Sequence, residues 1–325
     1  MNEFLNIIKG PIEAELDSFK ALFDKTLTHN DSALGSALEH IKKQKGKQMR
    51  PMLILLIAKA LGEVNDTTYH AAVALELLHT ASLVHDDVVD KADERRGQQS
   101  VNSLYDNKIA VLVGDHILST ALLSVCKTGR VDIITYLSQL GQTLSDGEIL
   151  QLTSNKQQLI SEQEYYNIIR QKTAALFKAC ATMGALSIGA DAQRMEQAEN
   201  FGQTLGTIFQ IRDDIFDYFP SSKIGKPTGN DMREGKLTLP AIYAVLHSDD
   251  EKIKSIAQKV KQLSASAEEI QQLVAYTIDN GGITYAEQKM QELHAQCMQF
   301  INSVSLTDIK KALTAYLDYC INREF

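Results

Sequence analysis

Tryptophan is absent from this chain of 325 residues, and proline occurs only five times. No Gly/Ser-rich linker interrupts the sequence either. Proline and linker segments commonly separate helices and domains, so their scarcity favours long helices within a single unit. No alternation of apolar and polar residues typical of strands is sustained anywhere. We therefore expect one all-α domain over residues 1–325, a helical bundle large enough to enclose a substantial core.

An excess of positive charge is also lacking. Lysine and arginine number 33 against 41 aspartates and glutamates, which gives a net charge of −8. Binding to a phosphate backbone requires clustered lysine and arginine in excess, so the composition argues against a general nucleic-acid binder. Solubility alone is sufficient to explain the acidity.

Signals for secretion and membrane insertion are missing as well. The four cysteines show neither a CxxC motif nor the spacing of metal ligands, which is typical of thiols in a reducing compartment. The N-terminal segment carries acids and lacks the apolar core of a signal peptide. The longest apolar runs, such as residues 52–58, are too short to span a bilayer. We expect a soluble cytoplasmic protein.

The most informative stretch that is present is LLHTASLVHDDVVDKADERR, residues 77–96. On a helix, Asp86 and Asp90 lie one turn apart, about 40° from each other around the axis, and Asp87 lies about 100° from Asp86. Crowded carboxylates repel one another, and a hard divalent cation relieves that repulsion. A solvated helix end could carry the same DDxxD pattern, so this motif alone leaves both interpretations open.

A second acidic motif favours the metal site. Asp213, Asp214 and Asp217 repeat the spacing of the first cluster at the end of another apolar helix. If the two helix ends face each other, their carboxylates form a cage that requires compensating positive charge. Mg²⁺ prefers octahedral oxygen coordination and often completes it with substrate phosphates. The two motifs together therefore predict a polyphosphate ligand.

Cations lie near both acidic motifs. The segment GKQMRP, residues 46–51, suits the start of a helix, where anions bind. The candidate phosphate-binding cations are Lys47, Arg50, Arg95, Arg96, Lys172, Lys226 and Lys236. They exceed the charge of one diphosphate, so two such ligands are plausible. Each cation is equally compatible with a solvated surface position, and His79 on its apolar helix is typical of a core residue as well as of a ligand.

Other phosphate-binding motifs are absent from the sequence: it has no P-loop, no kinase motifs and no convincing dinucleotide fingerprint. An apolar helical pocket beneath a metal and diphosphate site suits a ligand with a hydrocarbon body. Metal and cations turn the diphosphate into a leaving group, and the apolar pocket shields the carbocation from water. The expected chemistry is ionisation followed by alkylation of a second substrate.

Helix periodicity and cap signals predict the elements that carry these motifs. We expect helices over residues 2–27, 32–46, 66–90, 107–128, 131–154, 161–188 and 200–219. Capping boxes are expected at Ser161/Glu164, Ser266/Glu269 and Thr284/Glu287.

A series of short motifs in order gives the chain a resemblance to a known family. The motifs are GKQMRP, LLHTASLVHDD, DDVVDKADERRG, VLVGD, GEILQL, QKTAALF, FQIRDDIFDY, GKPTGND and EGKLTLP. With them the chain resembles the trans-isoprenyl diphosphate synthases over nearly its whole length. The resemblance implies an all-α bundle of the isoprenoid synthase type with a central apolar cavity.

The resemblance also implies roles for individual residues. Three Mg²⁺ ions would bind together with the allylic diphosphate. Their protein ligands would be Asp86, Asp90 and Asp213. Asp87, Asp214 and Asp217 would be supporting carboxylates. The allylic diphosphate would be bound by Arg95, Lys172, Thr173, Gln210 and Lys226. Isopentenyl diphosphate would be bound by Gly46, Lys47, Arg50, His79 and Arg96. In the family the allylic diphosphate ionises, the isopentenyl double bond attacks head to tail, and the departing pyrophosphate takes the proton.

Product length is expected to depend on Ala81 and Ser82, which are small and lie about one turn before Asp86. Short-chain members of the family carry a bulky aromatic near these positions, so this chain resembles the long-chain type. We expect an octaprenyl-like product of about C35 to C50, a precursor of quinone side chains. The alternatives are a short-chain farnesyl or geranylgeranyl synthase, the catalytic subunit of a heterodimeric heptaprenyl or hexaprenyl synthase, a terpene cyclase and a noncatalytic partner subunit.

The resemblance carries two further expectations and one departure. Family members generally dimerise through helices, so we expect a homodimer, and a long product suggests transient contact with a membrane surface during release. Gln99 and Asp106 stand where the family commonly has proline and glycine, so the loop after Arg96 need not follow the family geometry.

Overall fold

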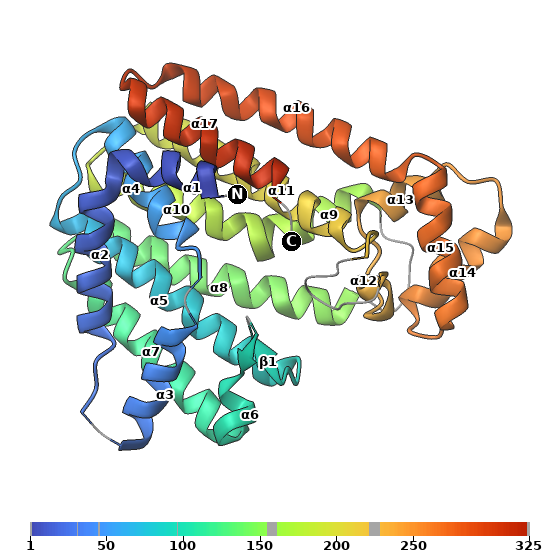
Figure 1. Ribbon diagram of the computed structural model, residues 1–325, viewed down its shortest axis with the longest axis horizontal. Coiled ribbons are helices and arrows are strands. Elements are labelled where there is room, and N and C mark those ends of the chain that lie inside the picture. The colour runs from blue at the N-terminus through green and yellow to red at the C-terminus, as the bar shows by residue number, and fades with distance from the viewer. Residues whose placement is uncertain are drawn as a thin grey trace.

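The computed structural model describes residues 2–30, 32–44, 46–95, 97–154, 161–220 and 228–323. Within these ranges the chain is almost entirely helical (Figure 1). The helices of the first half are α1 (Asn2–Lys9), α2 (Glu13–Thr26), α3 (Ser32–Lys43), α4 (Met49–Leu61), α5 (Asp66–Val89), α6 (Val101–Tyr105), α7 (Asn107–Cys126) and α8 (Val131–Ser154). Those of the second half are α9 (Glu162–Ile169), α10 (Ala175–Ser187), α11 (Ala192–Phe216), α12 (Asn230–Arg233), α13 (Leu239–Leu246), α14 (Glu251–Lys261), α15 (Ala267–Asp279), α16 (Gly282–Ser303) and α17 (Thr307–Asn322). The all-α prediction is confirmed.

A short hairpin follows α5. Its strands, β1 (Glu94–Arg95) and β2 (Gln98–Gln99), pair antiparallel. The hairpin folds back beside the C-terminal end of α5, because Asn102 Nδ2 donates to the carbonyl oxygens of Asp87 and Ala92. The segment that follows the first acidic motif is therefore held against the end of α5.

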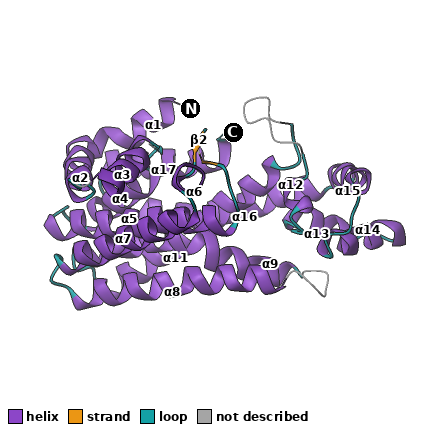
Figure 2. Cartoon of the chain, turned by 90° about the horizontal axis from the view of Figure 1, so that it is seen from below, coloured by secondary structure: helices purple, strands orange, loops and turns teal. Residues whose placement is uncertain are grey.

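Helix α5 is the buried centre of the bundle. It packs against α4, α7 and α10, so apolar residues are needed on most of its circumference (Figures 1 and 2). Its capping box is formed by Asn65, whose side chain accepts from the Thr68 N–H, and by Thr68, whose hydroxyl accepts from the Asn65 N–H. The predicted start of this helix at residue 66 is confirmed, although the N-cap is Asn65 and not Asp66. The long apolar stretch thus forms a rigid rod with its acids at the C-terminal end.

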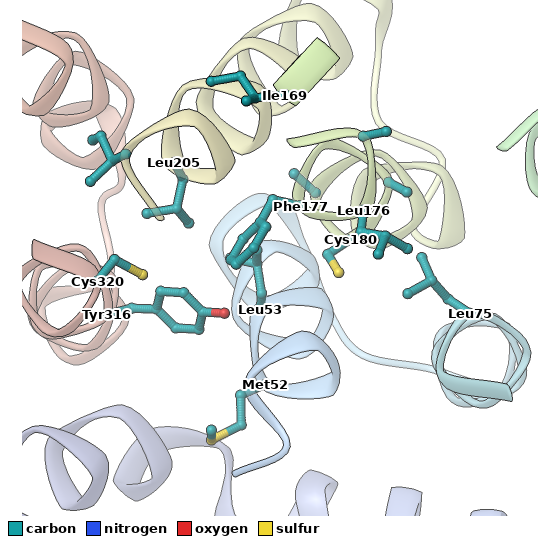
Figure 3. Packing of buried hydrophobic residues seen from close by; sticks show 14 of the residues in the cluster. Met52, Leu53, Leu75, Ile169, Leu176, Phe177, Cys180, Leu205, Tyr316 and Cys320 are labelled. Carbon is teal, nitrogen blue, oxygen red and sulfur yellow. The ribbon is translucent and has the colours of Figure 1, made fainter. Parts of the chain in front are cut away.

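The core of the bundle joins helices that lie far apart in the sequence. Figure 3 shows Phe177 of α10 between Leu53 of α4 and Leu205 of α11, with Tyr316 of α17 nearby. All four side chains are buried. Truncating a buried phenylalanine to alanine typically costs about 3–5 kcal/mol, so this packing holds the helices firmly in place.

Close contact between α10 and α11 requires two glycines. A Cβ atom at Gly206 would lie 2.6 Å from Ala174 Cα, and one at Gly202 would lie 2.7 Å from the Phe177 carbonyl oxygen. Both distances are shorter than real Cβ contacts allow, so no larger residue fits without moving a helix. The glycines thereby let α11, which ends in the second acidic motif, approach the segment that carries Lys172 and Thr173.

Three local predictions were wrong. Residues 2–27 do not form one helix, because the 3₁₀ turn Gly10–Ile12 separates α1 from α2, and Pro11 in that turn has no N–H to continue the ladder. Thr284 lies inside α16, which begins at Gly282 behind a left-handed Gly281, so it forms no capping box. The other two boxes, at Ser161 and Ser266, are confirmed.

The third wrong prediction concerns membrane-spanning length. By length and composition alone, α7 is apolar enough to cross a bilayer, although 39% of that stretch is buried inside the protein. A search for uninterrupted apolar runs does not find α7, because Asp115 and His116 interrupt its apolar sequence. Since core helices meet the same criteria, the finding describes α7 without assigning it to a membrane.

Candidate functional site

The first acidic motif divides into two environments. Asp86 is half-buried and Asp90 is exposed at the C-cap of α5, whereas Asp87 is only 3% exposed. Asp87 accepts a hydrogen bond from Arg95 Nε at 2.6 Å and pairs with Arg95 Nη2 at 2.5 Å. The offset of about 100° between successive helical residues explains why neighbouring acids face different partners. Asp86 and Asp90 therefore share the open side of α5, and Asp87 holds the hairpin.

A glutamate on α8 faces Asp86. Glu148 Oε2 pairs with Lys172 Nζ at 2.6 Å, and both side chains lie close enough to Asp86 to change its pKa. Burial and the charge of Glu148 raise the pKa of Asp86 to about 6, while Lys172 opposes the shift. Gly147 permits this approach, because a Cβ there would lie 3.2 Å from the Cβ of Gln171. Asp86, Glu148 and Lys172 thus form one charged group between α5, α8 and the turn of residues 170–174.

Lys172 and Thr173 lie in a π-helical turn, Arg170–Ala174, between α9 and α10. π-Helical turns inside α-helices are rare and occur frequently at functional sites. Helix α8 lies against this turn and α11 packs on it. The turn therefore brings a cation and a hydroxyl between the helices that carry Glu148 and the second acidic motif.

A chain of hydrogen bonds runs from this turn to the second acidic motif. Thr173 Oγ1 donates to Gln210 Oε1 at 2.6 Å, and Gln210 Nε2 donates to Asp214 Oδ1 at 2.7 Å. Tyr165 donates its hydroxyl to Asp214 Oδ2 at 2.6 Å. Asp214 is 3% exposed, and its burial, together with the charge of Asp231, raises its pKa to about 8. Both carboxylate oxygens of Asp214 are thus committed to protein donors.

The other two acids of this motif have different partners. Asp213 pairs with Arg323 at the end of α17. Asp217 is the C-cap of α11, and its two oxygens accept from the backbone N–H groups of Asn230 at 2.9 Å and Asp231 at 3.1 Å. The Asp213 side chain is 41% exposed, Asp214 is buried, and both oxygens of Asp217 accept from backbone N–H groups, so Asp213 is the one best placed to take an external ligand.

A cavity of about 170 Å³ lies beside the second motif. Its lining includes Lys172, Thr173, Gln210, Asp214, Asp231 and Lys236. Lys236 pairs with Glu234 at 2.5 Å, and Asp90 and Asp231 both favour its charged form. Lys172 lines this cavity together with Asp214 of the second motif and also acts on the pKa of Asp86 of the first motif, so the two acidic helix ends face the same space. The expectation that they converge is supported by this geometry.

A second cavity, of about 310 Å³, lies between α2, α3 and α5. It is lined by Gly46, His79, Asp87 and Arg95 together with apolar residues such as Phe19 and Leu83. The buried His79 therefore faces a cavity and is not enclosed only by core side chains. Arg95 lines this cavity with Gly46 and His79, which were expected to bind the second substrate. It was expected to act with Lys172 and Thr173, which line the other cavity.

Two further cations expected to bind the second substrate, Lys47 and Arg50, follow Gly46 in the sequence. Lys47 donates to the Tyr319 hydroxyl at 2.7 Å, and its ammonium group is 5.3 Å from the centre of the Tyr319 ring. Arg50 has a buried Nε without a hydrogen-bond partner. A buried donor without a partner is costly, and an anionic ligand would satisfy it. Arg96 and Lys226 lie outside the described residues.

The two positions expected to control product length lie one turn before Asp86. Ala81 is buried, and Ser82 donates its hydroxyl to the carbonyl oxygen of His79 at 2.8 Å. Neither residue lines the two cavities above. Their role in product length therefore stays a prediction.

The carboxylates have the chemistry of Mg²⁺ ligands but are not assembled as a preformed cage. Among the described residues, no three His, Cys, Asp or Glu side chains are grouped so that they could hold a metal ion. Mg²⁺ is commonly held by one or two carboxylates and completed by substrate phosphates. Asp86 and Asp90 on one side and Asp213 on the other fit that arrangement, with cations nearby for the phosphates.

Sequence reasoning missed three residues that organise this site. Glu148 was visible as a polar residue on an apolar stretch, but its contact with Lys172 depends on how α8 and α10 pack. Tyr165 fits the apolar face of its helix, so nothing in the sequence indicated a polar role. Its partner Asp214 lies 49 positions away. Arg323 lies near the C-terminus, 110 positions from Asp213, and no local pattern marked it.

Comparison with known proteins agrees with this arrangement. A family model described as polyprenyl synthetase matches residues 31–277. The chain is 31% identical over 281 residues to octaprenyl diphosphate synthase of Haemophilus influenzae, covering 86% of this chain and 85% of the relative. It is 30% identical over 325 residues to all-trans-nonaprenyl-diphosphate synthase (geranyl-diphosphate specific) of Rhodobacter capsulatus, covering 99% and 98%.

Solved structures show the same fold. Geranylgeranyl pyrophosphate synthase from Bacteroides thetaiotaomicron superposes with a TM-score of 0.86 at 45% identity, covering 99% of this chain and 100% of that one. A decaprenyl diphosphate synthase from Rhodobacter capsulatus superposes with a TM-score of 0.89 at 30% identity, covering 98% and 100%. From these matches and from the convergence of the two acidic helix ends, we conclude that the chain belongs to the polyprenyl synthetase family and is a prenyltransferase with the all-α isoprenoid synthase fold.

Proposed function

We propose that this prenyltransferase condenses isopentenyl diphosphate head to tail with an allylic diphosphate, in a Mg²⁺-dependent reaction, and makes a long-chain all-trans polyprenyl diphosphate. The observation that carries the proposal is the convergence of Asp86, Lys172 and the Thr173–Gln210–Asp214 hydrogen bonds between two acid-tipped helices. Carboxylates for metal and donors for phosphate lie within one space. The names of the relatives agree with this reaction class.

The allylic diphosphate is proposed to bind beside the π-helical turn. Lys172 supplies a positive charge there, and Thr173 would donate its hydroxyl to the diphosphate in place of Gln210 Oε1, to which it donates in this structure. Lys172 pairs with Glu148 in this structure, and its ammonium group has further donor hydrogens for a diphosphate. Mg²⁺, when bound by Asp86, Asp90 and Asp213, would neutralise the diphosphate and make it a better leaving group. Lys226 is proposed to add a donor, whereas Arg95 lines the cavity on the neighbouring face of α5 and acts on the pKa of Asp86 from that side.

The second substrate is proposed to bind in the cavity on the neighbouring face of α5. Gly46 and His79 line that cavity, and Lys47 and Arg50 follow Gly46 at the start of α4. Its apolar residues, among them Leu83, suit the five-carbon body of isopentenyl diphosphate. The double bond of isopentenyl diphosphate attacks the allylic carbon as the allylic diphosphate leaves. The condensed product then loses a proton to the departing pyrophosphate. This chain then needs no side-chain base.

Product length is the finer part of the proposal. The small, buried Ala81 supports a long product, and the relatives named octaprenyl and nonaprenyl synthase agree with it. A short-chain product is the rival, favoured by the 45% identity to a geranylgeranyl pyrophosphate synthase.

The purified chain should be incubated with radiolabelled isopentenyl diphosphate, farnesyl diphosphate and Mg²⁺, and its products separated by chromatography. A ladder that ends at about C35 to C50 is expected, because no bulky side chain stands at position 81 or 82 to stop the growing chain. A product that stops at C15 or C20 would reject the long-chain assignment. No product from the chain alone would favour a heterodimer, as the resemblance to heptaprenyl diphosphate synthase component 2 of Geobacillus stearothermophilus suggests.

We also propose that two copies associate through α7. Leu112 is 63% exposed and Leu123 is 67% exposed, and about three helical turns place them on the same face. Leu122 of α7 and Val131 at the start of α8 are exposed as well. Contiguous exposed apolar residues of this kind mark interaction surfaces, and a second copy offers the same apolar face in return.

We further propose a single domain, a cytoplasmic location and release of the product at a membrane surface. The chain forms one domain over residues 1–325, which is supported by the packing of N-terminal α1 against C-terminal α17. The enzyme acts in the cytoplasm, and its long product leaves through transient contact with a membrane surface.

A further inference from the structure

The guanidinium group of Arg323 is held by several contacts on α11. Its Nη2 contacts Asp213 Oδ1 and donates to the Phe209 carbonyl oxygen at 3.0 Å. Its central carbon lies 3.6 Å from the centre of the Phe209 ring and 5.5 Å from that of Phe216. A planar cation that stacks and pairs at once is characteristic of arginine. The end of α17 is therefore fastened to the second acidic motif.

This contact occupies Asp213, whose side chain is 41% exposed. Asp214 is committed to Tyr165 and Gln210, and Asp217 accepts from two backbone N–H groups. Arg323 thus neutralises the one acid of this motif whose side chain is 41% exposed. No other acid of either motif pairs with a residue from α17 in the part of the chain that the structure describes.

From this geometry we infer that Arg323 is a resident counterion that competes with Mg²⁺ for Asp213 and so sets the affinity of the metal on this side of the site. The inference rests on the proposed function. A carboxylate in contact with a guanidinium attracts a second cation less strongly, because the two cations repel each other across it. Mg²⁺ must therefore displace Arg323 from Asp213, and the apparent metal affinity is the intrinsic affinity multiplied by the fraction of molecules in which the pair is open.

Displacement does not require the core to move. Arg323 is the C-cap of α17, where the helical backbone already ends, and its ring contact and its bond to the Phe209 carbonyl do not involve Asp213. The side chain can release the carboxylate while it stays on the Phe209 ring. Arg323 would thus be a positioning residue that acts through Asp213.

The test measures metal binding in place of turnover. Mg²⁺ is titrated by calorimetry in the presence of inorganic pyrophosphate, and thermal unfolding is followed in the same mixtures. If the pair is closed in about nine tenths of the molecules, Arg323→Gln should lower the half-saturating Mg²⁺ concentration about tenfold. The same variant should unfold at a lower temperature without metal. Arg323→Lys keeps the charge but loses the planar stacking group, and should lie between the two.

Two controls separate this role from simple anchoring of the C-terminus. Arg194→Gln removes an exposed arginine that pairs with Asp191 at the opposite end of α11, and should leave the Mg²⁺ titration unchanged. In an Asp213→Asn background, Arg323→Gln should have no further effect on Mg²⁺, because the two residues act as a pair.

An unchanged or weakened Mg²⁺ affinity in Arg323→Gln would overturn the inference and leave Arg323 as a structural anchor. Failure of the wild-type protein itself to bind Mg²⁺ with pyrophosphate would overturn the proposed function along with it. Normal wild-type binding combined with no change in the variant would reject only the role of Arg323.

Discussion

Replacing Asp214 by asparagine should change how the stability of the metal-free protein depends on pH. Burial and the charge of Asp231 raise the pKa of Asp214 to about 8, although Tyr165 and Gln210 donate to it. In the unfolded chain an aspartate titrates near a pKa of about 3.9. The folded state therefore binds a proton that the unfolded state has released at any pH between these values.

The sign follows from this difference. The folded pKa lies above the unfolded one, so the stabilising contribution is complete below about pH 4 and is lost as the pH rises to about 8. A separation of about four units corresponds to an upper limit of about 6 kcal/mol. Asp231 lies beside Asp214 and shares in the proton uptake, so we expect about half of that limit, roughly 3 kcal/mol. Asparagine has no charge to bury and escapes this loss.

The measurement is urea-induced unfolding of both proteins in EDTA at about pH 4.5 and pH 8.5. Near pH 4.5 the two free energies of unfolding should agree within about 1 kcal/mol, the value of a weakened hydrogen bond. Near pH 8.5, Asp214→Asn should be the more stable by roughly 3 kcal/mol. Parallel stability curves across the whole range would refute the reasoning, because they would mean that Asp214 is ionised in the folded protein throughout.

Three further predictions address the proposed function. Lys172→Gln should lower kcat/KM for the allylic substrate by a factor of about 10² or more in steady-state assays, since a charged donor to the leaving diphosphate is lost; an effect below about tenfold would remove Lys172 from that role. Ala81→Phe should shorten the product in the chromatographic assay, and an unchanged ladder would place the pocket floor elsewhere. Leu112→Glu with Leu123→Glu should give a monomer in sedimentation, because two charges on each copy would enter the apolar interface. Leu246→Glu, at an exposed leucine of α13, is the matched control, and a dimer that persists in the double variant would refute the α7 interface.

Much of the fold could be predicted from the sequence because it depends on neighbours within one or two helical turns. Residues 131–154 were predicted as a helix and form α8 with the same bounds. The capping box of Ser161 and Glu164 also formed as predicted, since both partners lie within one turn. Pro11 also marked the break between α1 and α2 locally, but the apolar periodicity of residues 2–27 favoured one continuous helix.

The types of residue at the site were also set by the sequence. Two acidic motifs with identical spacing, each at the end of an apolar helix, predicted oxygen ligands for a metal together with a phosphate ligand. Lys172 acts on the pKa of Asp86 and lines one cavity with Asp214, which agrees with that interpretation. The family resemblance added roles to these residues, and those roles await the experiments above.

Only the tertiary structure decided which partner each acid has. Asp87 pairs with Arg95 and Asp213 with Arg323, and Asp214 accepts a hydrogen bond from Tyr165, although the two motifs have the same spacing in the sequence. Helical periodicity fixes the direction of a side chain around its own axis, but the side chain it meets depends on the packing of separate helices. That packing rests on buried contacts between distant segments, such as those at Gly202 and Gly206, and no local pattern encodes it.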